Sequence, residues 1–333
     1  MQKVTIKDVA KLAKVSPSTV SRVLSGNPSI SDDTCKRVKN AVKELHYTPN
    51  TTARSLRCEK SKSIGVVFPD ISGEFYATCA SAILKYARMS DYTVLFTESG
   101  HNIKAEKDGI KALLERRIDG IIFIGDNSDI PLIQSIAAQS IPIVTGDRTV
   151  DNIPSVTFNN RETVQEMVDS LYKSGCRKFM YVGETLTGQS NLWDRYNGYT
   201  DALKKYNDTT SVIFLEESLH GDKLKTARRL FTKKIITSLP DVIITSNDLI
   251  AQGIISAAYE NRINIPNDMQ ITGFDDSLSS AYFIPSITTV SQNIDELAKR
   301  CFSMLMDLIN KKNAVSSIIE QNIIARNSAK VNI

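Results

Sequence analysis

The 333-residue chain has few of the residues on which metal and hydrolytic chemistry depend. It contains five cysteines and three histidines, and the cysteines lie far apart without a CxxC pair. This argues against a disulfide framework or a thiolate zinc site and leaves little for histidine-based hydrolysis or metal binding. No apolar run reaches the roughly 18 residues that a membrane span needs, and the first residues lack a signal-peptide core. We therefore expect a cytoplasmic protein without a cofactor, a metal or a membrane partner.

Motifs of nucleotide-dependent and hydrolytic enzymes are also missing. No G-x-G-x-x-G follows the first predicted strand, and neither G-x-x-x-x-G-K-[ST] nor G-x-S-x-G occurs. No nucleophile, base and orienting group can be assembled, so we predict that the protein is not an enzyme. At 41% hydrophobic and 23% charged residues, the chain has the composition of a globular protein rather than a disordered one.

The charge is unevenly distributed along the chain. Residues 1–62 hold 13 of the 41 Lys and Arg residues but only 5 of the 37 Asp and Glu residues, which gives +8 against −4 for the remainder. A basic segment joined to a mildly acidic body is typical of a polyanion-binding module attached to another domain. A solvated charged surface would give the same charge, so local structure has to decide.

Three short helices are predicted within this basic segment. Thr5, with an acid three residues later, resembles a capping box before an apolar helical pattern. Ser16 and Pro17 suit the N-cap and first position of a second helix, which residues 26–28 end. Ser31 starts the third. Two short helices joined by a turn of three or four residues, followed by a third helix, predict a helix-turn-helix.

The polar face of the second helix is the predicted DNA-reading surface. In this geometry the second helix enters the major groove with its early residues at the base edges. Ser18 and Arg22 are four residues apart and share a face. We expect Arg22 to make a bidentate contact to guanine and Ser18 to hydrogen-bond to more than one base. Any three-helix bundle has a polar face, but the turn spacing, the caps and the charge together favour DNA binding.

The segment after Pro49 permits two interpretations. Leu56 lies between Arg54 and Arg57 in a stretch too short for a stable isolated helix. Such a segment can order on DNA and insert a leucine between base steps in the minor groove. A flexible linker with an incidental leucine explains the local chemistry equally well.

Short β-branched runs alternate with helical patterns from Ser63 onward. Buried parallel strands are predicted at residues 64–68, 93–96, 120–124, 141–144, 178–182, 212–215, 242–244 and 269–272, with helices over 74–90, 102–116 and 128–138. Two successive βαβ sets predict an α/β body of two doubly wound parallel sheets, with a ligand at the carboxyl ends of the strands.

Polar residues cluster just after these strands or at helix starts. They are Asp147, Asn159, Asp194, Arg195, Asn247, Asp248, Asp275 and Asp276. Individually each suits a cap or a turn. As a set, with Phe75, Tyr76 and Trp193, they suit a polar ligand that has hydroxyls to pair and a flat face to stack.

Several motifs resemble LacI/GalR-type bacterial repressors. TIKDVA at 5–10, VSPSTVSRVL at 15–24 and YTPNTTARSL at 47–56 are similar to the signature of that family's DNA-binding head. The similarity continues in family order through the body, in segments that include WDR at 193–195, SND at 246–248, GFDD at 273–276 and SITTV at 286–290. It covers essentially the whole chain.

The resemblance implies a homodimer whose subunits carry a helix-turn-helix head, a hinge helix and a body like type I periplasmic binding proteins. The implied division is residues 1–48 for the DNA-binding domain, 49–61 for the hinge, 62–160 with 291–320 for the N-terminal lobe, and 161–290 with 321–333 for the C-terminal lobe. Leu56 would enter the minor groove at the centre of a near-palindromic operator. The expected DNA-binding residues are Thr5, Ser16, Pro17, Ser18, Thr19, Ser21, Arg22, Asn27, Tyr47, Asn50, Ala53, Arg54 and Leu56.

A small effector is expected between the lobes. Its expected binding residues are Phe75, Tyr76, Asp147, Asn159, Trp193, Arg195, Asn247 and Asp275. An arginine with an aspartate that can grip vicinal hydroxyls favours a sugar or sugar derivative, because charged groups make the stronger hydrogen bonds. The sequence departs from the family at Asn159, where many members have aspartate, and at residues 219–221, which lack an aromatic residue found in several relatives. It also lacks a leucine-heptad tail, so no tetramer is expected.

The resulting hypothesis is a ligand-responsive transcriptional regulator, a repressor in the bacterial cytoplasm that is nucleoid-associated when bound to double-stranded operator DNA. Two alternatives stay open. One is a global regulator controlled mainly by a protein partner. The other is a sugar-binding protein without a role at DNA.

Overall fold

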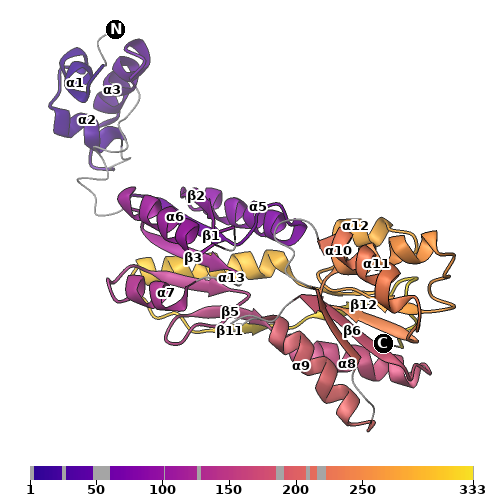
Figure 1. Cartoon of the computed structure of the whole chain (residues 1–333). Coiled ribbons are helices and arrows are strands. Elements are labelled where there is room, and N and C mark those ends of the chain that lie inside the picture. Colours follow the sequence, from indigo (N-terminus) through magenta and orange to yellow (C-terminus); the bar gives the residue numbers. More distant parts are fainter. Residues whose placement is uncertain are drawn as a thin grey trace. The chain divides into compact units, whose positions relative to one another are not determined.

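The computed structural model describes residues 4–24, 28–47, 61–100, 102–125, 129–184, 191–207, 211–215 and 223–332. The chain divides into two compact units, Met1–Ser61 and Lys62–Ile333, which we call the head and the body. Figure 1 shows the helices of the head and the layered sheets of the body.

Local signals position the helices of the head. These are α1 (Ile6–Ala13), α2 (Pro17–Leu24) and α3 (Asp32–Glu44). The backbone N–H of Thr5 donates to Asp8 Oδ2 at 2.8 Å, which closes the predicted capping box. The N–H of Thr19 donates to Ser16 Oγ at 3.1 Å, so Ser16 caps α2. The helices then bury Val9, Val20 and Val38 against one another, which makes the predicted helix-turn-helix.

The first lobe of the body is built on a six-stranded parallel sheet with the order β11-β5-β4-β3-β1-β2. Its strands are β1 (Ser63–Phe68), β2 (Thr93–Glu98), β3 (Gly120–Ile124), β4 (Ile143–Gly146), β5 (Ser155–Phe158) and β11 (Ser317–Ile319). Its helices are α5 (Glu74–Met89), α6 (Ile103–Glu115), α7 (Ile130–Ala137) and α13 (Ile294–Ile309).

Alternation along the strands of the first lobe distributes the helices over both faces of the sheet. Ile64, Val66 and Phe68 of β1 pack with α5 and α13, whereas Val67 packs with α6 and α7 on the other face. In Figure 1, the yellow α13 lies among elements from the first half of the chain, although it comes near the C-terminus.

The second lobe is built on a parallel sheet with the order β7-β6-β8-β9 and an added antiparallel pair, β10 with β12. The strands are β6 (Phe179–Glu184), β7 (Ser211–Leu215), β8 (Val242–Thr245), β9 (Gln270–Thr272), β10 (Thr289–Ser291) and β12 (Asn322–Ile324). The helices are α8 (Asn160–Lys173), α9 (Asn191–Lys204), α10 (Lys223–Leu230) with a π-helical turn Phe231–Ile235, α11 (Asp248–Glu260) and α12 (Leu278–Tyr282). The predicted fold class is therefore confirmed: an all-α head and an α/β body of two doubly wound sheets.

Within the described ranges, the chain crosses between the lobes at three places. Residues 159–160 join β5 to α8, residues 292–293 join β10 to α13, and residues 320–321 join β11 to β12. The strands β5, β10, β11 and β12 beside these crossings were not predicted from the sequence. None of the helices in the described part of the chain is both long and apolar enough to cross a membrane.

Candidate functional site

The outer face of α2 has the exposure expected of a DNA-reading surface. Pro17, Ser18 and Arg22 are exposed, while Val20 and Val23 on the opposite side are buried. Ser16 Oγ lies 2.7 Å from Ser18 Oγ and 2.9 Å from Thr19 Oγ1, so the hydroxyls at the start of the helix form one hydrogen-bonded group. These hydrogen bonds restrict the orientation of the hydroxyls on the face of α2 that would meet the base edges.

Some of the other predicted DNA-binding residues lie in the described part of the head, and the rest lie outside it. Thr5 is exposed and Ser21 is partly exposed. Tyr47 is partly buried and packs against the head core, so part of its ring is used for folding. Five predicted positions, Asn27, Asn50, Ala53, Arg54 and Leu56, lie outside the described residues.

Both sheets of the body have a topological switch point, which is where ligands bind in open α/β sheets. In the first lobe the strand order reverses between β1 and β3, and in the second between β6 and β8. At the first, Tyr76 packs over Gly125: a Cβ there would lie 2.7 Å from Tyr76 Oη, and φ is +80°. At the second, Glu184 ends β6 and Ser246 follows β8. Of the predicted effector residues, Tyr76 lies at the first of these switch points and Asn247, directly after Ser246, lies at the second.

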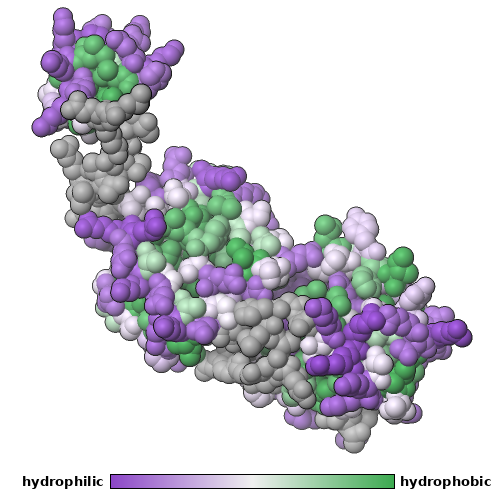
Figure 2. Space-filling view, turned by 45° about the horizontal axis from the view of Figure 1, so that its top comes forward, coloured by the Kyte–Doolittle hydropathy of each residue, from purple (hydrophilic) through white to green (hydrophobic). Residues whose placement is uncertain are grey.

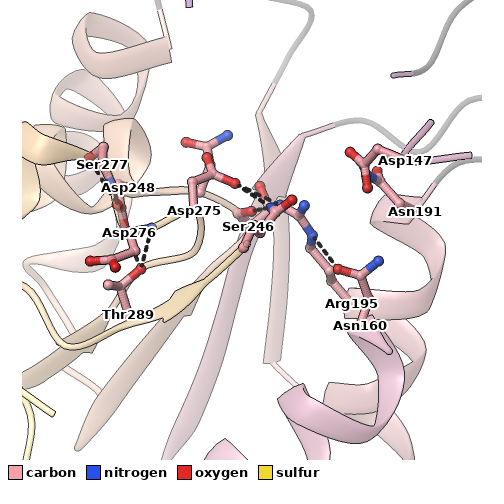
Figure 3. A network of polar contacts seen from close by, with 12 residues as sticks. Asp147, Asn160, Asn191, Arg195, Ser246, Asp248, Asp275, Asp276, Ser277 and Thr289 are labelled. Carbon is pink, nitrogen blue, oxygen red and sulfur yellow. Dashed lines mark hydrogen bonds and ion pairs between the residues drawn. The ribbon is translucent and has the colours of Figure 1, made fainter. Parts of the chain in front are cut away.

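Arg195, on α9, is the centre of a buried polar network at the second switch point (Figure 3). The side chain is only 4% exposed. Its Nη1 donates to the Ser246 carbonyl at 2.6 Å and lies 3.5 Å from Asp275 Oδ1. Its Nε donates to Asn160 Oδ1 at 3.4 Å, and the guanidinium lies 3.7 Å above the ring centroid of Phe274. A buried cation needs such partners, so the structure fixes Arg195 in place.

Asp275 is the acidic partner of Arg195 in this network. Its Oδ1 also accepts a hydrogen bond of 2.8 Å from Gln292 Nε2, and its backbone φ of +111° is unusual for a residue with a side chain. Burial raises the pKa of Asp275 to about 8, although the nearby Arg195 charge opposes that rise. The carboxyl therefore titrates near neutral pH.

The raised pKa of Asp275 gives a testable pH dependence. The folded state holds this proton up to about pH 8, whereas the unfolded chain releases it near 3.8, the ordinary pKa of an aspartate. Stability therefore falls as pH rises between these two values, by up to about 1.4 kcal/mol per pH unit from this one group. We expect Asp275→Asn to flatten the fall in melting temperature across this range, as measured by calorimetry. An unchanged slope in the variant would assign the pH dependence to other groups.

Asp147, which follows β4 in the first lobe, reaches across to the second lobe. It is 4% exposed and adopts a φ of +56°. Its Oδ2 accepts a hydrogen bond from the amide of Asn191, the first residue of α9, and Figure 3 shows the two side chains facing each other. Glu74 makes a second contact between the lobes: its carboxylate accepts from the Leu278 backbone N–H and, at 3.2 Å, from Ser279 Oγ.

A cleft of about 580 Å³ lies between the lobes and takes only part of the predicted effector set. Asp147, Asn159 and Trp193 line it, together with Arg148, Thr149, Thr157, Phe158, Asn160, Arg161, Glu162, Asn191, Asp194 and Ile318. Phe75, Tyr76, Arg195, Asn247 and Asp275 are not among its lining residues. The structure thus divides the predicted residues among three places. Asp147, Asn159 and Trp193 line the cleft, and Asp275 lies in the network around Arg195, with Asn247 directly after Ser246. Phe75 and Tyr76 pack against each other in the first lobe, beside Gly125.

Several of the polar residues that follow strands have structural partners. Asn159 Oδ1 accepts from the Gln321 N–H at 2.8 Å. Asn247 Oδ1 caps α11 by accepting from Ile250 N–H, while its amide donates to Glu184 Oε1 at 2.7 Å. Asp248 accepts from Ser277 and Thr289, and Asp276 pairs with Arg326. The cap explanation therefore applies to Asn247, whereas Asp248 and Asp276 bind residues far away in the sequence.

Sequence reasoning missed an ion pair beside this network. Glu184 Oε2 lies 2.7 Å from Lys223 Nζ, on the first residue of α10. Asn191 and Gln292 were missed as well. Glu184 and Gln292 end or follow short strands, which is the same signal that identified Asp147 and Asp275. Among the described residues, no group of His, Cys, Asp and Glu side chains could hold a metal ion.

Comparison with known proteins agrees with this architecture. A family model described as bacterial regulatory proteins of the lacI family matches residues 5–50, and one described as a periplasmic binding protein-like domain matches residues 168–329. The transcriptional regulator RegA of Clostridium saccharobutylicum is 32% identical, with 97% of this chain and 98% of RegA covered.

Two solved structures are similar to the whole chain or to most of it. The Lac repressor dimer bound to operator and an anti-inducer has a TM-score of 0.85 at 24% identity, covering 98% of this chain and 99% of that chain. A periplasmic binding protein/LacI transcriptional regulator from Alkaliphilus metalliredigens, complexed with D-xylulofuranose, has a TM-score of 0.71 at 26% identity, covering 81% and 99%. The chain therefore belongs to the LacI family of bacterial regulatory proteins and is a transcriptional regulator rather than an enzyme.

Proposed function

We propose that this regulator is a repressor that binds a near-palindromic operator as a homodimer and responds to a small effector held between the lobes. The observation that carries the proposal is the buried Arg195, paired with the partly buried Asp275 at the carboxyl ends of β8 and β9. A buried guanidinium needs several hydrogen bonds to replace water and is a weak source of stability. Its position at a switch point favours a role in binding.

A sugar or sugar derivative is the proposed effector class. Arg195 and Asp275 offer a donor and an acceptor to neighbouring hydroxyls, and Trp193, 39% exposed at the cleft, offers a flat face for a ring. The similar regulator from Alkaliphilus metalliredigens was solved with D-xylulofuranose. The proposed site comprises Phe75, Tyr76, Asp147, Asn159, Trp193, Arg195, Asn247 and Asp275.

Exposed apolar side chains of the second lobe support the proposed homodimer. Leu278, Tyr282 and Ile284 are 69%, 80% and 87% exposed and lie on or directly after α12. Figure 2 shows apolar residues gathered over both lobes of the body on the face drawn there. Patches of this kind mark interaction surfaces, and the similar Lac repressor was solved as a dimer. The domain division given from the sequence is part of the same proposal.

At the operator, two modes of recognition are proposed. Ser18 and Arg22 would read base edges in the major groove, and Leu56 would deform the minor groove at the operator centre. Exposed basic residues of the head, such as Lys7 and Lys11, would contact phosphates. Operator affinity should then fall steeply with added salt.

A thermal-shift screen tests the effector. Mono- and disaccharides, sugar phosphates, nucleosides and purine bases are added to the purified protein, since a ligand of the folded state raises the melting temperature. We expect at least one sugar or sugar derivative to do so and then to change operator affinity in a binding assay. Silence across the panel would reject the sugar proposal. The alternative hypothesis, a global regulator controlled by a protein partner, would then be tested by a pull-down with this protein as bait.

A further inference from the structure

Each described segment that crosses between the lobes carries a buried amide side chain. Asn160 lies on the first crossing, Gln292 on the second and Gln321 on the third, with exposures of 2%, 5% and 8%. A buried amide is unfavourable unless its donors and acceptors find partners. A segment that only connects the two lobes does not need a buried amide. The hydrogen-bond partners of these three amides therefore indicate what else the crossings do.

The amides form one line of contacts that passes through the Arg195–Asp275 pair. From the third crossing, Gln321 Nε2 donates to Asn160 Oδ1 at 3.3 Å. The same oxygen accepts from Arg195 Nε at 3.4 Å, and Arg195 Nη1 lies 3.5 Å from Asp275 Oδ1. From the second crossing, Gln292 Nε2 donates to that Asp275 oxygen at 2.8 Å. All three crossings are thus connected to the pair; Figure 3 shows its middle section, with Asn160 on one side of Arg195 and Asp275 on the other.

Two atoms in this line have unused bonding capacity. Gln292 Oε1 and Gln321 Oε1 are buried and have no hydrogen-bond partner among the described residues. Unsatisfied buried acceptors cost free energy. An arrangement of the crossings in which these oxygens gain a donor would recover part of that cost.

We propose that Asn160, Gln292 and Gln321 are positioning residues that couple the Arg195–Asp275 pair to the angle between the two lobes. A change in the distance between Arg195 and Asp275 displaces Asn160, which contacts Arg195, and Gln292, which contacts Asp275. Both residues lie on segments that connect the two lobes, so their displacement changes the angle between the lobes. This proposal rests on the proposed function in one respect only, namely that the Arg195–Asp275 pair is part of the effector site. The coupling itself is a property of the ligand-free protein.

Single-molecule energy transfer measures the lobe angle directly. Lys312 in the first lobe and Lys204 in the second have side chains 69% and 74% exposed, and an azide-bearing amino acid in place of each accepts donor and acceptor dyes. Labelled chains are mixed with excess unlabelled protein, so that a dimer contains at most one labelled chain and energy transfer occurs only within that chain. Gln292→Met and Gln321→Met remove one amide each with little change in side-chain length. Gln270→Met is the matched control, because that amide donates to Cys176 Sγ within the second lobe.

We expect one narrow transfer peak for the parent protein and the control, and a shifted or split peak for both crossing variants. Because the two substitutions break the same line, the double variant should shift no further than the larger single shift. Unchanged peaks in both crossing variants, with only a lower melting temperature, would overturn the coupling. A double-variant shift equal to the sum of the single shifts would also contradict it. Either variant suffices if the other fails to fold. No effector is present, so neither result bears on the sugar screen.

Discussion

Replacing Arg195 with alanine is expected to remove the effector response while leaving the operator affinity of the ligand-free protein nearly unchanged. Hydrogen bonds from a charged group are worth about 1.5–3 kcal/mol, which corresponds to roughly 10- to 150-fold weaker effector binding. Arg195 is 4% exposed and belongs to the body, whereas the proposed base-reading residues belong to the head. Isothermal titration with the sugar found in the screen measures the first quantity, and operator binding measures the second.

The folded state should tolerate this substitution better than most losses of a buried charge. Removing one partner of a buried pair commonly costs about 3–5 kcal/mol, because the other charge is left uncompensated. Here the pKa of Asp275 already stands at about 8, and Arg195 is a charge that lowers it. Without Arg195 the carboxyl stays protonated at neutral pH, so no unpaired charge remains.

Arg161→Ala is the matched control for this experiment. Arg161 lines the cleft, but its side chain is 48% exposed and paired with Asp201, so its loss should leave effector binding within about twofold of the parent, as expected for an exposed pair. Equal losses in the Arg161 and Arg195 variants would indicate a general electrostatic effect. An intact response in Arg195→Ala would show that the effector binds elsewhere.

Arg22→Ala is expected to cost roughly 1–3 kcal/mol of binding free energy on the cognate operator and much less on random DNA. Arg22 is exposed on the outer face of α2, one turn after Ser18 and away from the buried Val20 and Val23. The head core does not depend on its side chain, so the loss should not come from unfolding. Fluorescence anisotropy with both DNAs, at two salt concentrations, measures the effect.

Lys7→Ala provides the comparison, because Lys7 is an exposed basic residue on α1 and is one of the proposed phosphate contacts. Loss of a phosphate contact weakens all sequences about equally and lowers the salt slope by roughly one. A substitution that removes base readout instead changes the ratio between cognate and random DNA. If Arg22→Ala weakens both DNAs equally, Arg22 contacts the backbone and another residue reads the operator.

Short-range signals in the sequence were sufficient for the head and for the longer strands. Thr5, Ser16 and Ser31 act on groups three residues away, so their role as caps is predictable from spacing. The predicted strands inside the sheets, such as β1, β3 and β8, are buried on both faces, which gives continuous hydrophobic runs. The edge strands β2 and β7 were also predicted to be buried, but most of their residues are partly or fully exposed. Strand β10, of three residues, has no such pattern and forms only because the second lobe brings β12 beside it.

Contacts between lobes could not be predicted in the same way. The partners Asp147 and Asn191 are 44 residues apart and Glu74 and Leu278 are 204 apart, so their pairing depends on how both sheets pack. Sequence position placed Arg195 at a helix start and Asp275 after a strand, and the structure then placed the two side chains together. It also assigned Asn159 to a hydrogen bond with Gln321, which no local pattern indicates.

The position of β11 at one edge of the first sheet has a consequence for synthesis. The ribosome makes β5 at residues 155–158, but the strand that covers its outer edge, residues 317–319, follows more than a hundred residues later. Until then the nascent first lobe has an open strand edge and lacks α13, and such surfaces favour aggregation. Premature termination within the second lobe should therefore yield an insoluble product rather than a free first lobe, and production in cells should depend on chaperone capacity.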